Sequence, residues 1–278
     1  MKRILVPCDF STQARQAYTF ALDIAKKTNA EIYVLHAVDV PFMYSSYSPE
    51  VPSYLTQEGW DRLTADAKQR FQEMKGEHAR QNDISLRIEI GPATMTILNF
   101  IETNQIDLVV MGTKGVSGFD EMVIGSNTEK VVRFSKVPVF VVKKAVNLSS
   151  IKSIVLPTTL ELNQSAFMNK VKELQKMFGA TLRLLVINTP GSKKKIRDEN
   201  AELRDFADHY KLEKFQFDIQ DAENVEDGIL HFVHQTKSDM IAMGTHSRKG
   251  LSHLFMGSVT EDLVNHMDCP IWTFTIKK

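Results

Sequence analysis

Cysteine is scarce in this chain, and the scarcity excludes one large class of protein. Only Cys8 and Cys269 occur among the 278 residues, so the chain has no disulfide framework of the kind that stabilises small secreted domains. The apolar run that follows Met1 stops at Pro7, which is too short for the hydrophobic region of a signal peptide. We therefore expect a reducing, cytoplasmic setting.

The chain also lacks an excess of charge and a long hydrophobic run. Its 34 basic and 34 acidic side chains cancel, so no net field attracts nucleic acid or an anionic membrane surface. No apolar run approaches the ~20 residues of a membrane-spanning helix. The sequence therefore predicts neither a nucleic-acid nor a membrane partner.

Short apolar strands alternate with amphipathic helices through the first half of the chain. One helix carries an apolar stripe from Ala14 to Ala25, with Ser11 as its predicted N-cap. A second helix is predicted from Trp60 to about Ala79. This alternation predicts an α/β fold with a parallel, doubly wound sheet and helices on both faces. The predicted strands are Ile4–Pro7, Ile32–Val38, Leu86–Ile90, Ile106–Met111 and Val137–Val142.

The second half of the chain repeats the first. Ser153–Thr159 repeats Arg3–Asp9, and Asp239–Thr245 repeats Asp107–Thr113. A period this long indicates duplication of a whole domain, because solenoid repeats are far shorter. We predict two tandem doubly wound domains, residues 1–146 and 147–278, each with a five-stranded parallel sheet.

A glycine-rich stretch follows the fourth strand. It begins with Gly112-Thr113-Lys114-Gly115, and Gly125-Ser126 follows after nine intervening residues. Ser126 and Glu129 stand at capping-box spacing, which predicts a helix start. A strand, a glycine loop and a helix N-terminus together favour an anion site, because backbone N–H groups can approach phosphate oxygens there. The spacing matches neither a Walker A loop nor the dinucleotide fingerprint. The alternative is a glycine-rich surface turn before an ordinary capped helix.

This stretch resembles the ATP-binding signature of the universal stress protein family, and the repeat extends the resemblance over essentially the whole chain. The resemblance implies strand order 3-2-1-4-5 in each domain. It places an adenine nucleotide between the first and fourth strands, where strand order reverses. The nucleotide is ATP, with AMP and ADP as alternatives, and with or without Mg²⁺. The site residues carried over from the family are Pro7, Asp9, Ala37, Val38, Met111, Gly112, Gly115, Gly125, Ser126 and Asn127.

Two positions weaken the same assignment in the second half. Thr159 replaces Asp9, which removes a carboxylate, and Ser247 replaces Gly115, which adds a Cβ where the backbone should approach a ligand. We therefore expect a degenerate site in the second half. In the first half, Asp9 could instead serve only as a cap-like residue for the helix that follows it.

The resemblance implies an adenine-nucleotide-binding stress-response or regulatory protein that holds ATP in its N-terminal domain and has unidentified protein partners. One alternative is an ATP-hydrolysing enzyme of the adenine nucleotide α-hydrolase-like class. Another is a dimeric scaffold that binds no nucleotide. No Ser/His/Asp or paired-carboxylate arrangement can be recognised, and His231 and His234 lack a further metal ligand. We predict no catalytic residue and no metal site of the protein's own, with at most slow ATP hydrolysis.

The last strand of each copy bears on assembly. Val137–Val142 and Ile271–Ile276 each close a sheet, so each is an edge that invites pairing. We expect the two halves to pack as a pseudo-symmetric dimer within one chain, with these strands at the interface. The alternatives are two domains joined by a flexible linker, or further pairing into a homodimer.

Overall fold

The computed structural model of the protein describes residues 1–39, 56–76, 83–113, 125–190, 199–246, 263 and 266–276. The first half contains β1 (Arg3–Pro7), α1 (Thr12–Thr28), β2 (Glu31–Val38), α2 (Gln57–Lys75), β3 (Ile84–Ile90), α3 (Ala93–Thr103), β4 (Leu108–Gly112), α4 (Ser126–Phe134) and β5 (Val139–Val142). The second half contains β6 (Ser153–Pro157), α5 (Ser165–Phe178), β7 (Thr181–Asn188), α6 (Glu199–Tyr210), β8 (Phe215–Asp221), α7 (Val225–Thr236), β9 (Ile241–His246) and β10 (Ile271–Ile276). A 3₁₀ turn, Leu148–Ser150, lies between the halves.

Each half has the strand order predicted from the sequence. Neighbouring strands follow β3-β2-β1-β4-β5 in the first half and β8-β7-β6-β9-β10 in the second, and all pairs within a half are parallel. The predicted α/β class, doubly wound halves and order 3-2-1-4-5 are therefore confirmed.

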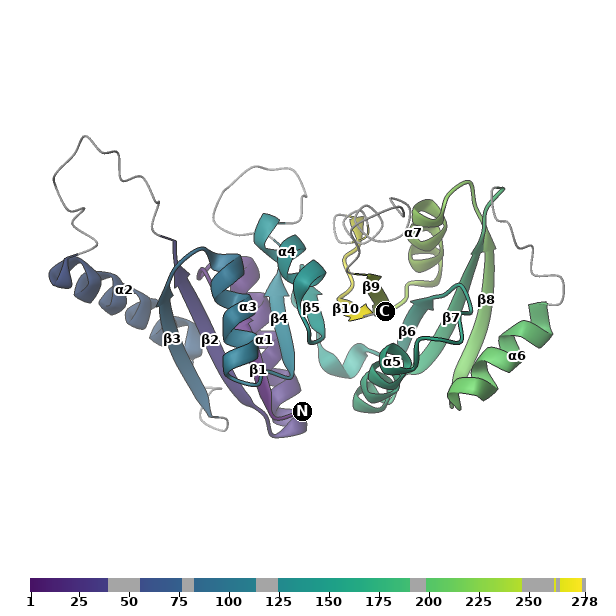
Figure 1. Ribbon diagram of the computed structural model, residues 1–278, viewed down its shortest axis with the longest axis horizontal. Helices are drawn as coiled ribbons and strands as arrows, with labels where there is room; N and C mark the ends of the chain where they lie inside the picture. The colour runs from purple at the N-terminus through teal and green to yellow at the C-terminus, as the bar shows by residue number, and fades with distance from the viewer. Residues whose placement is uncertain are drawn as a thin grey trace.

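The two sheets are joined into one ten-stranded sheet, which differs from two separate sheets (Figure 1). β5 and β10 pair antiparallel, with Phe140 opposite Trp272. The two edges predicted to attract each other thus satisfy their backbone groups within one chain. This pairing is the arrangement expected of an intrachain pseudo-dimer, and pairing between chains stays a prediction.

The strands lie between two layers of helices. Ile4, Leu5 and Val6 of β1 are fully buried, which explains why this strand is a continuous apolar run and not an alternating one. Ile4 and Val6 pack in a core that includes buried residues of α1, α2, α5 and α6, and Leu5 packs in a core that includes residues of α3, α4 and α7. Both cores contain residues of both halves.

The helix ends show where the sequence prediction was right and where it was wrong. Ser11 caps α1 as predicted, since its hydroxyl accepts a hydrogen bond from the Ala14 N–H. The second helix begins earlier than predicted, at Gln57, because the Thr56 hydroxyl accepts from the Gly59 N–H and sets the start. Over the residues that the structure describes, no helix is long and apolar enough to cross a membrane.

Candidate functional site

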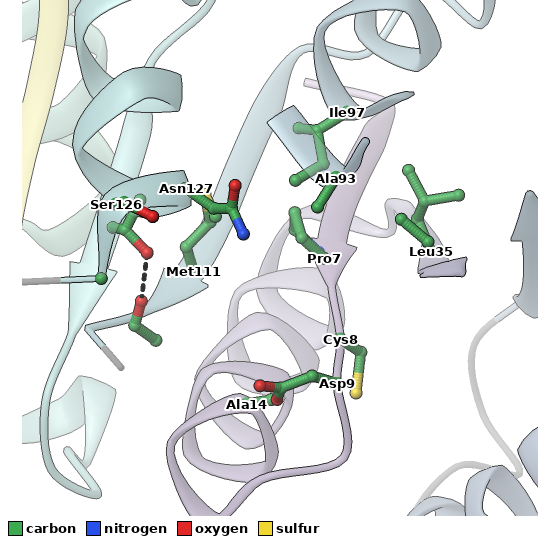
Figure 2. A pocket seen from close by; sticks show the side chains of 14 residues that line it. Pro7, Cys8, Asp9, Ala14, Leu35, Ala93, Ile97, Met111, Ser126 and Asn127 are labelled. Carbon is green, nitrogen blue, oxygen red and sulfur yellow. Dashed lines mark hydrogen bonds between the residues drawn. The ribbon is translucent and has the colours of Figure 1, made fainter. Parts of the chain in front are cut away.

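A cavity of about 180 Å³ lies at the carboxyl ends of β1, β2 and β4. The first residues of α3 and α4 complete its wall (Figure 2). β1 lies between β2 and β4, which leave it in opposite directions along the sheet. Ligands of open parallel sheets bind at this topological switch point, so the cavity has the position expected of a ligand site.

The structure brings most of the predicted site residues to this cavity. The predicted residues that line it are Pro7, Asp9, Ala37, Met111, Gly112, Gly125, Ser126 and Asn127. Val38 is not among the lining residues, and its carbonyl accepts a hydrogen bond from the Gly91 N–H at 3.0 Å. Gly115 and its counterpart Ser247 lie outside the described residues.

The wall has an apolar side and a polar side. Leu35, Ala37 and Ile97 supply aliphatic surface from β2 and α3. Asp9, Ser126 and Asn127 supply a carboxylate, a hydroxyl and an amide. A ligand that combines a flat apolar part with hydroxyl or anionic groups would match both sides.

The N-terminus of α4 differs from the sequence prediction. Gly125 is its N-cap and no side chain caps the helix, so the predicted capping box between Ser126 and Glu129 is wrong. A glycine in this position leaves the N–H groups of the first turn without the usual side-chain oxygen. α3 also starts without a side-chain cap. Both helix ends therefore present amide donors and positive dipole ends toward the cavity, which favours an anion there.

Hydrogen bonds fix these helix ends in place. The Thr128 hydroxyl donates to the Gly112 carbonyl at 2.9 Å, which ties α4 to the end of β4. The Thr94 hydroxyl donates to the Asn127 side-chain carbonyl at 2.8 Å, which ties α3 to α4. The polar side of the cavity is thus built on rigid elements, so little reorganisation is needed to bind.

Gly112 has a packing role that the sequence interpretation missed. A Cβ on Gly112 would lie 2.8 Å from the backbone carbon of Gln13. A glycine is therefore required at this position because β4 meets the start of α1 at close range. The family-based assignment of Gly112 to phosphate binding is not needed to explain this residue.

Asp9 lies at the cavity wall, and its geometry bears on its cap-like alternative. Its carboxylate accepts a hydrogen bond from the Ser11 N–H at 3.0 Å. The N-cap of α1 is Ser11 itself. Asp9 therefore shapes the turn between β1 and α1 and also lines the cavity, so the two roles are compatible.

The sequence interpretation left out six lining residues: Cys8, Ala14, Leu35, Ala93, Ile97 and Thr128. Ala93 and Ile97 could have been found, because they open the helix that follows the predicted third strand on the carboxyl side of the sheet. Thr128 stands two residues after Ser126 and lies on the same first turn. The site prediction was carried over from the family signature, which does not include these six positions.

Cys8 is held in an environment that suppresses its reactivity. Burial raises the pKa of the Cys8 thiol to about 12, and the Asp9 carboxylate adds to the rise. The hydrogen bond from the Phe10 N–H, at 3.3 Å, and the Arg15 guanidinium act in the opposite direction. Burial also raises the pKa of Cys269 to about 12.

These thiols are expected to react at least ~100-fold more slowly in the folded protein than in urea, because the thiolate is the nucleophile. A colorimetric thiol reagent at pH 8 measures both rates, and Cys269→Ser isolates the signal of Cys8. Because each thiol has a higher pKa in the folded state than in the unfolded state, its contribution to folding stability is complete below the unfolded pKa of about 9. That contribution declines as pH rises from about 9 toward 12. Rapid reaction of the folded Cys269→Ser variant would contradict the burial of Cys8.

Comparison with known proteins identifies the family. The model of the universal stress protein family matches residues 1–143 and again residues 150–274. The chain belongs to the universal stress protein family. It is 34% identical over 149 residues to a universal stress protein of Methanocaldococcus jannaschii, an alignment that covers 51% of this chain and 82% of that protein. It is 27% identical over 152 residues to the universal stress protein YxiE of Bacillus subtilis, which covers 51% of this chain and 98% of the relative.

A solved structure resembles the whole chain. The universal stress protein from Archaeoglobus fulgidus superposes with a TM-score of 0.75 over 98% of both chains, at 19% identity. This likeness shows the fold of the two halves together. Over the described part of this universal stress protein, no group of three or more His, Cys, Asp or Glu side chains is placed to hold a metal ion.

Proposed function

We propose that this universal stress protein binds one adenine nucleotide in the cavity of its first half and acts as a regulatory protein. ATP is the first choice, with ADP and AMP as alternatives. The observation that supports the proposal is the combination, in one cavity, of an aliphatic wall with two uncapped helix N-termini. The family's ATP-binding signature at Gly112, Gly115 and Gly125-Ser126 supports the same ligand.

In this proposal the base and the phosphates use different sides of the cavity. The adenine ring packs on Leu35, Ala37 and Ile97, since a flat heteroaromatic group gains from burial against aliphatic side chains. The ribose hydroxyls and phosphates face Asp9 and the first turn of α4, where a carboxylate acceptor and amide donors lie. Mg²⁺, when present, would be shared between the phosphates and the Asp9 carboxylate, because this hard cation prefers oxygen ligands.

Binding is favoured over hydrolysis by the kind of groups that line the wall. Among the described lining residues, Asp9 carries the one carboxylate, and none is a histidine or a lysine. Rapid hydrolysis would need a positioned base to activate water. The Asp9 carboxylate already accepts the Ser11 N–H, which suits a structural and ligand-binding role.

Isothermal calorimetry of the full chain with ATP, with and without Mg²⁺, is expected to give a stoichiometry near one. Gly115→Val should abolish binding, because the family signature assigns this glycine to the phosphates and an added side chain would hinder close backbone approach. Asp9→Asn should weaken binding about tenfold through loss of a charged hydrogen-bond acceptor. The matched control is Thr159→Asn, at the equivalent position of the second half, which should change nothing. Binding that survives unchanged in Gly115→Val would disprove the assignment.

A further inference from the structure

The two halves can be compared position by position at the end of their first strands. Pro7 corresponds to Pro157, and the hydrogen bonds from Cys8 N–H to the Leu35 carbonyl and from Thr158 N–H to the Leu185 carbonyl match. Phe10 and Leu160 both adopt positive φ, 64° and 59°. The backbone of the turn after the first strand therefore has the same shape in both halves. The two halves differ near this turn in their side chains.

The aliphatic wall of the first cavity is only partly preserved in the second half. Leu35, Ile97 and Met111 correspond to Leu185, Ile229 and Met243, which keep their size and their burial. Two small residues have become large. Ala37 on β2 corresponds to Ile187 on β7, and Ala93 on α3 corresponds to Val225 on α7.

A third difference makes room for the added atoms. Thr96 on α3 corresponds to Gly228 on α7. A Cβ on Gly228 would lie 2.8 Å from Cγ2 of Ile187 and 3.0 Å from its Cδ1. Ile187 therefore reaches from β7 to α7 beside Gly228. Ala37 and Ala93, the counterparts of Ile187 and Val225, both line the first cavity, whereas Thr96 does not. Ile187 and Val225 both pack against the buried core on this face of the sheet.

Apolar side chains also lie close to Gly244 on β9, the counterpart of Gly112. A Cβ on Gly244 would lie 2.5 Å from Cδ1 of Ile276 and 3.4 Å from Cε2 of Phe167. The corresponding residues of the first half are Lys144 and Ala17. Large apolar side chains thus surround the second-half counterpart of Gly112 as well.

We propose that the second half carries a built-in plug, made by Ile187, Val225 and Gly228, in the place where the first half holds the base. The plug stands in for a ligand and keeps this half filled at all times. Removing it would uncover a site for a purine base. The proposal rests on the proposed function, because it takes the first cavity as the base site.

The test exchanges the three residues between the halves of the full chain. Ala37→Ile, Ala93→Val and Thr96→Gly together install the plug in the first half, and adenosine binding should weaken by at least about 100-fold. Ile187→Ala, Val225→Ala and Gly228→Thr, added to that plugged variant, should restore a stoichiometry near one by opening the second half. Circular dichroism checks that each variant is folded, and the single variant Ile187→Ala serves if the triple does not fold.

The control is Leu184→Ala. Leu184 is a buried residue of β7 that faces the core on the opposite side of the sheet from Ile187, so its removal should admit no adenosine. Xenon NMR gives a second readout, because a dry apolar cavity takes up xenon whatever the natural ligand is. Wild-type protein that binds neither adenosine nor ATP would refute the proposed function and leave the plug to the xenon result. Undiminished binding by the plugged first half, or an opened second half that takes up neither adenosine nor xenon, would overturn the plug.

Discussion

Replacing Phe140 with alanine is expected to destabilise the whole chain by about 3–5 kcal/mol, the usual cost of removing a buried aromatic ring. Phe140 is fully buried on β5, at the junction of the two halves. Its ring makes edge contacts with Phe20 of α1, at 5.1 Å between centroids, and with Phe178 of α5, at 6.2 Å. One side chain therefore joins helices of both halves, and its loss leaves a cavity between them.

Urea unfolding tests this expectation, measured by circular dichroism and by the fluorescence of Trp272 in a Trp60→Phe background that removes the chain's other tryptophan. Trp272 is buried opposite Phe140 on β10, so its emission reports on the second half at the junction. Both signals should shift together in Phe140→Ala. Phe134→Ala is the matched control, because Phe134 is 53% exposed and its loss should cost less than about 0.5 kcal/mol. A shift seen by one signal alone would show that the halves unfold independently.

The junction illustrates what could be predicted from the sequence. The apolar last strand of each repeat identified two edges, and backbone hydrogen bonding alone implied that they would pair. The register of the pair could not be predicted, because it depends on side chains such as Phe140 and Trp272 that fit each other only once the halves meet. The antiparallel direction of the pair also depends on how the halves meet, and it joins the two sheets into one.

The candidate site also combines features that could be predicted from the sequence with features that could not. Asp9, which follows β1, and Met111 and Gly112, which end β4, line the cavity, since strand ends in a parallel sheet share one edge. The N-cap of α4 is Gly125, one residue before the predicted capping serine Ser126. The serine-and-glutamate spacing suggests a capping box, yet the extended backbone of the cap position falls on Gly125. Contacts such as that between Ile187 and Gly228 join segments far apart in the sequence, and no local pattern reveals them.

Asp218→Ala is expected to destabilise the second half by about 2–3 kcal/mol, because it leaves a largely buried positive charge without its partner. The Arg183 guanidinium donates to both oxygens of Asp218, at 2.6 and 2.9 Å, and the two side chains are only 19% and 20% exposed. The guanidinium carbon also lies 4.7 Å from the centroid of the Phe232 ring. Such two-pronged pairs are stronger than surface ion pairs.

The first half has different side chains at the position of the Arg183–Asp218 pair. Tyr33 stands at the position of Arg183, packs 5.7 Å from the Phe100 ring, and has the Arg87 guanidinium over its face. In the first half the cation lies over the ring of the β2 residue Tyr33. In the second half the corresponding β7 residue, Arg183, is itself the cation and lies over the Phe232 ring. Because each set is internally complete, removal of both charges should cost less than removal of one. We expect Arg183→Leu with Asp218→Leu to be more stable than Asp218→Ala alone.

The midpoint of urea unfolding at pH 7 measures this difference. Glu58→Ala is the control, because Glu58 and Arg62 form a pair of similar length, 2.7 Å, whose side chains are 78% and 79% exposed. Solvent screens that pair, so its loss should cost less than about 0.5 kcal/mol. Equal effects of Asp218→Ala and Glu58→Ala would mean that burial adds nothing to the Arg183 pair. A double variant less stable than Asp218→Ala would instead mean that the ion pair is a net source of stability for this half.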